Sequence, residues 1–115
     1  MDATVTSLLI YAESGGPGQD LDDVEITATG PEGNRSKKHA VHLVSATEYV
    51  DSHPRANIVL DIDPERLASL VGNVIRVGEA TLTVTREPQQ CAGVYADVVE
   101  PGHVAVGDAL LVADA

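Results

Sequence analysis

Short β-patterned segments, separated by glycine and proline clusters, run along the whole chain and constrain its fold more than any other feature. In residues 57–62 the apolar side chains Ile58, Leu60 and Ile62 fall on one face of an extended segment. Such alternation is typical of a half-buried strand. The predicted strands cover residues 4–12, 24–29, 40–45, 57–62, 74–77, 80–85, 94–99 and 104–112.

Helix signals are few and short. Residues 46–51 have room for one helical turn, and Asp63, Pro64 and Glu65 provide an N-cap, a first-turn proline and an acidic first turn for a helix that ends at Gly72. Strands do not alternate with long helices, so a parallel α/β sheet is not expected. Because closure removes exposed strand edges, we predict a mainly β protein: a closed or nearly closed β-barrel with two short helices.

Length and charge narrow the classes of function. The 115 residues form one domain, 1–115, with a core of aliphatic residues because only 3% of the chain is aromatic. A net charge of −11 argues against nucleic-acid and membrane-surface partners. Residues 1–10 have no basic segment ahead of their apolar run, so we expect a cytoplasmic protein whose thiol is reduced. The oligomeric state is left open.

The chain has one cysteine, Cys91, within a polar loop over residues 86–93. A single thiol cannot form an internal disulfide. Arg86 would lower its pKa if the loop folded back, and a thiolate is the form that carries sulfur or binds a soft metal. The alternative is a cysteine that packs as a small apolar side chain.

One short run, residues 35–39, concentrates positive charge. Arg35, Lys37 and Lys38 are three of the seven basic residues, and they could bind the phosphate of a cofactor, the arginine as a two-pronged donor. The alternative is a solvated loop that balances nearby acids. His39 and His42 lie three apart in a β-patterned segment, residues 39–44 (His-Ala-Val-His-Leu-Val), where strand geometry would point their side chains to opposite faces, so no histidine metal site is expected.

In order along the chain, several segments resemble the MOSC domain, the family named for the C-terminal part of molybdenum-cofactor sulfurases. The resemblance is strongest over residues 24–112. The segments that carry it are residues 30–35 (Gly-Pro-Glu-Gly-Asn-Arg), 42–45 (His-Leu-Val-Ser), 55–59 (Arg-Ala-Asn-Ile-Val), 67–77, 78–80, Cys91 and 101–108 (Pro-Gly-His-Val-Ala-Val-Gly-Asp).

The resemblance implies a β-barrel that binds the molybdenum cofactor, molybdopterin, or carries sulfur on Cys91. It implies a molybdenum-dependent oxidoreductase or a sulfurtransferase-like protein, with Cys91 as catalytic residue and molybdenum ligand. Arg35 falls where the family usually has Gly-Asp-Arg, and Asn34 replaces the usual aspartate. Asn34, Arg35, Lys37 and Lys38 are therefore the implied cofactor-binding residues.

Two further expectations follow from the resemblance. No cysteine-desulfurase domain with its lysine is present, so pyridoxal phosphate should not bind, and the partner would be a separate desulfurase or reductase. The short chain and Asn34 also support another class of protein, a non-catalytic barrel for binding or assembly that has lost the cofactor and keeps Cys91 as a structural residue.

Overall fold

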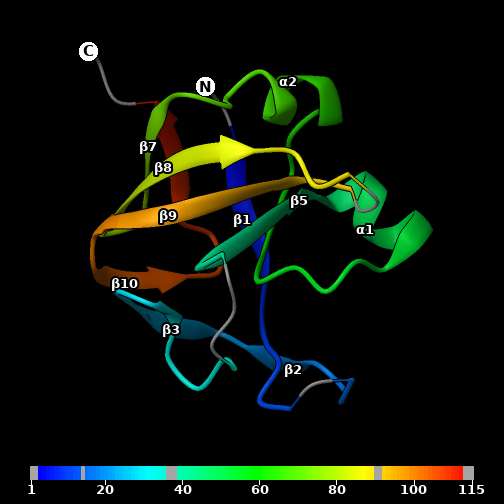
Figure 1. The fold of residues 1–115 in the computed structure, drawn as a ribbon, viewed down its shortest axis with the longest axis vertical. Helices are drawn as coiled ribbons and strands as arrows, with labels where there is room; N and C mark the ends of the chain where they lie inside the picture. The colour runs from blue at the N-terminus through cyan, green and yellow to red at the C-terminus, as the bar shows by residue number, and fades with distance from the viewer. Residues whose placement is uncertain (1–2, 14, 36–38, 90–91, 113–115) are drawn as a thin grey trace.

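A computed structural model describes residues 3–13, 15–35, 39–89 and 92–112. Within these residues, seven strands close into a β-barrel (Figure 1). In the order in which they pair around the wall, the strands are β1 (Ala3–Ile10), β6 (Ile58–Leu60), β5 (Val41–Ser45), β9 (Val94–Glu100), β8 (Ala80–Arg86), β7 (Val74–Val77) and β11 (Ala109–Val112). Pairing of Ala3 with Leu110 joins the first strand to the last and closes the wall. The predicted mainly β barrel is confirmed.

Four further strands lie outside this ring in the described part of the chain. β2 (Gln19–Leu21) pairs with the end of β1, while β10 (Gly102–Ala105), β3 (Asp23–Thr27) and β4 (Gly30–Pro31) form a separate small sheet. Neither β2 nor β4 was predicted, because two or three residues carry no readable alternation. The strand predicted over 104–112 was wrong as a single element, since a turn at Gly107 divides it into β10 and β11.

The two helices of the described residues are short, as expected. α1 (Ala46–Ser52) is capped by Ser45, whose side-chain oxygen accepts a hydrogen bond from the Glu48 amide at 3.1 Å. α2 (Pro64–Ala68) has its proline in the first turn, but Asp63 makes no side-chain capping bond and the helix ends before the predicted Gly72. Neither helix is long and apolar enough to cross a membrane.

The strands β5 and β6 are buried on both faces, and so is the end of β1 over residues 8–10. Ile58 and Leu60 of β6 face the barrel interior, whereas Val59 belongs to a second apolar cluster on the outer side. This outer cluster consists of Leu9, Tyr11, Val44, Ala56 and Val59, with Ala46, Tyr49 and Ala92 packed against it. Figure 1 shows α1 next to the end of β5. Tyr49 of α1 and Ala92 of the β8–β9 loop pack against the same cluster. The half-buried strand predicted over 57–62 is therefore a fully buried one.

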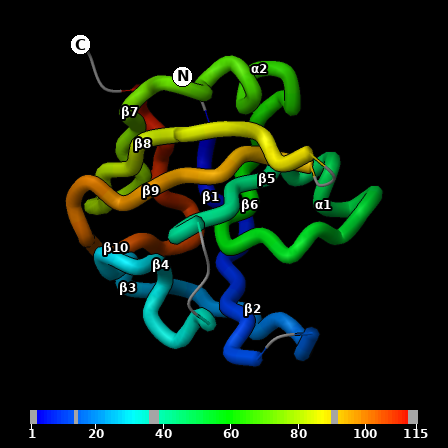
Figure 2. Tube along the Cα trace, in the orientation of Figure 1, coloured from blue at the N-terminus to red at the C-terminus, as the bar shows by residue number. Residues whose placement is uncertain are grey.

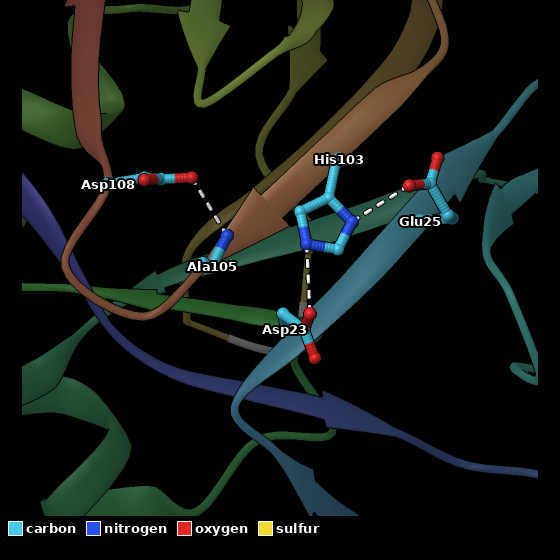
Figure 3. Close-up of polar contacts among 5 residues, drawn as sticks. All are labelled: Asp23, Glu25, His103, Ala105 and Asp108. Atoms are coloured by element: carbon cyan, nitrogen blue, oxygen red, sulfur yellow. Dashed lines mark hydrogen bonds and ion pairs between the residues drawn. The ribbon is translucent and has the colours of Figure 1, made fainter.

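A histidine between two carboxylates links β10 to β3. His103 Nε2 lies 2.9 Å from Asp23 Oδ2, and Nδ1 lies 2.8 Å from Glu25 Oε1 (Figure 3). The hydrogen bond to Glu25, reinforced by the charge of Asp23, raises the pKa of His103 above its ordinary value. The Asp108 carboxylate accepts a hydrogen bond from the Ala105 amide at 2.8 Å and fixes the turn that follows β10.

This arrangement predicts that His103 makes stability depend on pH. Because the folded pKa is raised, the stabilising contribution of His103 is complete below its unfolded pKa of about 6.5 and disappears as the pH rises through the folded value. Denaturant unfolding at pH 5.5 and pH 8.5 should show the wild type losing more stability on alkalinisation than His103→Gln. The matched control is His53→Asn, at the exposed left-handed residue that follows α1. Equal slopes for the wild type and His103→Gln would contradict the prediction.

Candidate functional site

The loop between β8 and β9 is anchored by His42 of β5. His42 Nε2 lies 2.7 Å from the carbonyl oxygen of Ala92, the residue that follows Cys91. A carbonyl only accepts, so Nε2 carries the proton and donates. The imidazole is 8% exposed and meets the Tyr95 ring edge-on, with ring centroids 5.1 Å apart. The backbone on the C-terminal side of Cys91 is therefore held against the barrel wall by a buried side chain.

A second histidine, an arginine and a tyrosine lie beside this anchor. The His39 ring stacks on Tyr95 with centroids 4.0 Å apart and planes 9° apart. The Arg86 guanidinium lies 5.7 Å from the Tyr95 ring centre, and its nitrogen is 2.9 Å from His39 Nε2. A guanidinium only donates, so His39 Nε2 is the acceptor in this contact. An exposed positive charge is thus fixed by an aromatic stack at the end of β8.

The expected opposite orientation of His39 and His42 was wrong, since both rings contact Tyr95. The reason is that β5 begins at Val41, so His39 precedes the strand and does not follow its alternation. Within the described ranges, no three histidine, cysteine, aspartate or glutamate side chains are grouped so that they could hold a metal ion.

The structure places Asn34 and Arg35 beside β1. Asn34 Oδ1 accepts a hydrogen bond from the Tyr11 amide at 2.7 Å, and the Arg35 amide donates to the Tyr11 carbonyl at 2.8 Å. The Arg35 side chain is exposed. Asn34 therefore closes the loop after β4 onto the chain that follows β1. Figure 2 shows this segment near β2, away from the β8–β9 loop at α1.

The neighbourhood of Tyr11 contains another cation. The Arg55 guanidinium lies 4.2 Å from the Tyr11 ring centre and donates to the carbonyls of Gly16 and Glu13 at 2.6 and 3.1 Å. Burial raises the pKa of the Tyr11 phenol, and the nearby Tyr49 adds to this effect. Arg55 therefore holds the loop after β1 through these hydrogen bonds. Tyr11 stays a neutral phenol near neutral pH.

The remaining predicted site residues, Cys91, Lys37 and Lys38, lie outside the described residues. Their chain neighbours are placed: Ala92 at the His42 anchor and His39 at Arg86. The basic run over 35–39 therefore starts at Tyr11 and ends at Tyr95. Of the described basic residues, Arg86 is the one in contact with the ring cluster beside Ala92, and no described contact brings Arg35 there.

Sequence reasoning missed His42 and Tyr95 as parts of this site. The histidine at position 42 lies among the apolar residues Val41, Leu43 and Val44, and this pattern could have indicated a specific contact. A buried polar group needs a hydrogen-bonding partner. Asn57 gave a similar signal. It is 4% exposed, its Oδ1 accepts from the His42 amide at 3.1 Å, and its Nδ2 donates to the Leu9 carbonyl at 3.2 Å.

Comparison with solved structures defines the class of fold. A hypothetical protein aligns with a TM-score of 0.79 at 18% identity, covering 100% of this chain and 70% of its own. YuaD from Bacillus subtilis aligns with a TM-score of 0.76 at 16% identity, over 97% of this chain and 96% of its own. YiiM from Escherichia coli, a MOSC-domain protein, aligns with a TM-score of 0.69 at 14% identity, over 97% and 70% of the two chains.

The fold is therefore a MOSC-like β-barrel, in agreement with the resemblance noted in the sequence. YiiM from Geobacillus stearothermophilus aligns similarly, with a TM-score of 0.71 at 14% identity over 97% of this chain and 75% of its own. No family model matches the sequence, and no curated protein does. These likenesses define the fold alone.

Proposed function

We propose that the protein is a sulfur carrier or a molybdenum-cofactor-binding protein that uses the Cys91 thiolate. The observation that supports this most is the arrangement beside Ala92, where a buried histidine holds the loop and the Arg86 guanidinium lies on the Tyr95 ring. A fixed positive charge near a thiol favours the thiolate form. Thiolate is the form required for nucleophilic attack and for binding a soft metal.

As a sulfur carrier, Cys91 would exchange sulfur with a persulfide on a separate desulfurase. The Cys91 thiolate attacks the terminal sulfur of the donor persulfide, a new sulfur–sulfur bond forms, and the donor's bond breaks. The donor cysteine leaves as a thiolate, so electrons balance without another reagent. Arg86 favours this step by stabilising the attacking anion.

As a cofactor-binding protein, the chain would hold the anionic end of the molybdenum cofactor with basic side chains. The described donors fit such a group in type but lie at two places: Arg86 contacts His39 at one end of the basic run, and Arg35 is exposed beside Tyr11 at the other. Lys37 and Lys38 belong to the same run and are proposed to contribute, with Cys91 as the metal ligand. When bound, the cofactor would supply two-electron redox chemistry.

The side chain of Asn34 has a structural role in the proposed function. Its side-chain oxygen accepts from the Tyr11 amide, an interaction that the usual aspartate could also make. Asparagine in place of the usual aspartate therefore removes one negative charge but keeps the hydrogen bond that closes the loop. It also removes a carboxylate that would oppose binding of an anion next to Arg35.

Purification without air, followed by metal analysis and absorbance, tests whether the protein binds the molybdenum cofactor. Incubation with a persulfide-loaded desulfurase tests whether Cys91 accepts sulfur. We expect the wild type to retain molybdenum or to take up stoichiometric sulfane sulfur. Cys91→Ser should lose both abilities with an unchanged unfolding midpoint. If Cys91→Ser matches the wild type in both measurements, the proposed function is wrong.

A non-catalytic barrel for binding or assembly is the competing class of function. In that case Cys91 packs as an apolar side chain and has no thiolate at neutral pH. The exposed Arg86 and the polar residues of the loop argue against such packing. An unreactive thiol, together with the absence of molybdenum and sulfane sulfur in both proteins, would support the competing class.

A further inference from the structure

We infer that Arg86, held by Tyr95 and His39, is a binding site for a tetrahedral oxyanion, either free or as the phosphate group of a larger molecule. The inference goes beyond the proposed function, because it depends on neither Cys91 nor a metal. It rests on three features of the described residues: a strand irregularity that turns Arg86 outward, an aromatic stack that orients its guanidinium, and N–H donors that no described carboxylate takes.

A register shift of the β-bulge type brings Arg86 to the outer face of the barrel. It lies between Val84 and Arg86 in the pairing of β8 with β9, so Thr85 is the extra residue. Val84 is fully buried and pairs with Ala96, whereas Arg86 is exposed and pairs with Tyr95. Without the extra residue, Arg86 would lie on the same face as Val84, because strand side chains alternate. Bulges that re-aim a side chain in this way are common beside functional sites.

The extra residue is itself held in place. Thr85 Oγ1 donates a hydrogen bond to the Tyr95 carbonyl oxygen at 3.2 Å. Tyr95 pairs with Arg86 of β8 on one side and with His42 of β5 on the other, so the three residues form one row across neighbouring strands. The position of Arg86 in this row is therefore set by the backbone hydrogen bonds of the barrel wall.

Two rings orient the guanidinium. The Arg86 Cζ lies 5.7 Å from the Tyr95 ring centre, and His39 Nε2 accepts a hydrogen bond from an Arg86 nitrogen at 2.9 Å. The His39 ring is stacked on Tyr95 with centroids 4.0 Å apart, so both contacts come from one assembly. An arginine that is already oriented loses less side-chain freedom when a ligand binds.

The hydrogen-bonding capacity of Arg86 is only partly used. A guanidinium has five N–H donors, and the described contacts of Arg86 use one of them. Asp97 lies two residues from Tyr95 on the same face of β9, but both ion pairs among the described residues involve His103, so no described carboxylate neutralises Arg86. Parallel N–H groups of a guanidinium match two oxygens of a phosphate-like anion. The arrangement therefore fits an oxyanion in charge and in geometry.

Titration with sulfate, followed by the ¹H–¹⁵N chemical shifts of the backbone amides, tests the site. We expect saturable shifts at Arg86 and Tyr95 with a Kd on the order of 1–10 mM, which is weak because the net charge of −11 opposes any anion. Arg86→Gln should weaken binding at least about fivefold. The matched control is Arg76→Gln, which removes the same charge from an exposed position on β7 and should leave the Kd within about twofold of the wild type.

Two substitutions of Tyr95 test whether the aromatic stack orients the guanidinium. Tyr95→Phe keeps the ring and should bind sulfate within about twofold of the wild type, whereas Tyr95→Leu removes the ring and should weaken binding about three- to fivefold. Unfolding midpoints establish that both variants are folded before the titration. Equal affinities of the two variants would contradict the role given to Tyr95.

A comparison of inorganic phosphate with phenyl phosphate at about pH 7.5 distinguishes the two sources of the anion. If phenyl phosphate binds at least about tenfold more tightly, the site takes the phosphate group of a larger molecule. If the two ligands bind equally, the site takes the free anion.

The absence of saturable shifts at Arg86, or equal Kd values for Arg86→Gln and Arg76→Gln, would overturn the inference. Cys91→Ser should bind sulfate like the wild type, and a loss of sulfate binding in this variant would also overturn it. A Cys91→Ser variant that matches the wild type in molybdenum and sulfane sulfur would instead contradict the proposed function, while sulfate binding that depends on Arg86 would still support the oxyanion site.

Discussion

Replacing Gly93 with alanine is expected to destabilise the protein by about 2–6 kcal/mol. A left-handed conformation at a non-glycine residue costs about 1–3 kcal/mol. Overpacking against fixed neighbours costs about 1–3 kcal/mol more. Here the neighbour is the Leu43 carbonyl oxygen of β5, which is part of the barrel wall and cannot move aside as a flexible side chain would. Denaturant unfolding monitored by circular dichroism measures the change.

Gly72 provides the matched control. Its φ of 90° is close to that of Gly93, but an added Cβ at position 72 meets no atom within 4 Å in the described structure. Gly72→Ala therefore carries only the conformational cost, about 1–3 kcal/mol. Equal losses for the two alanine variants would show that the β8–β9 loop does not press on β5 as described.

Leu82→Ala is expected to cost about 2–5 kcal/mol, because it removes a large side chain from a closed core. Leu82 is fully buried on β8, opposite Ile75 of β7 and Val98 of β9. The strands around it are hydrogen-bonded on both sides, so the wall cannot collapse into the cavity. Since a domain of this kind is stable by only about 5–15 kcal/mol, the loss is a large fraction of the total.

Leu111→Ala is the control for the core substitution. Leu111 is 53% exposed on β11, so its removal should change the free energy of unfolding by less than about 1 kcal/mol. The comparison uses the same change of side chain at two positions of one barrel. Similar losses at both positions would mean that Leu82 does not lie in the core.

The barrel was predictable because its strands have local signatures. The strand within residues 57–62 and the Gly78–Glu79 turn between β7 and β8 have signatures that depend only on neighbours in sequence, and both are present as β6 and the β7–β8 turn. What the pattern could not reveal was that α1 and Ala92 would cover the outer face of β6, making it buried on both sides. Ala92 is more than 30 residues from β6 in the chain, and α1, although near in sequence, reaches β6 only through the tertiary fold.

The site was less predictable than the fold. Cys91 and the basic run could be singled out as chemistry-bearing residues. One described residue at the edge of each, Ala92 and His39, lies at the cluster of His42 and Tyr95. The described part of the chain gives that cluster a different cation from the one expected, Arg86 in contact with His39, while Arg35 lies with Tyr11. Pairing of β5 with β9 determines this, and no local pattern predicts which loops that pairing brings together.

The proposed function depends most on a reactive thiolate at Cys91, and the pKa of this thiol can be measured directly. The rate of alkylation by iodoacetamide, followed from about pH 5 to about pH 10, gives the apparent pKa of the single thiol. We predict a value well below the ordinary value of about 8.5, because the Arg86 charge lies beside the anchored loop. A value at or above about 8.5 would contradict the account, since Cys91 would then be protonated at neutral pH.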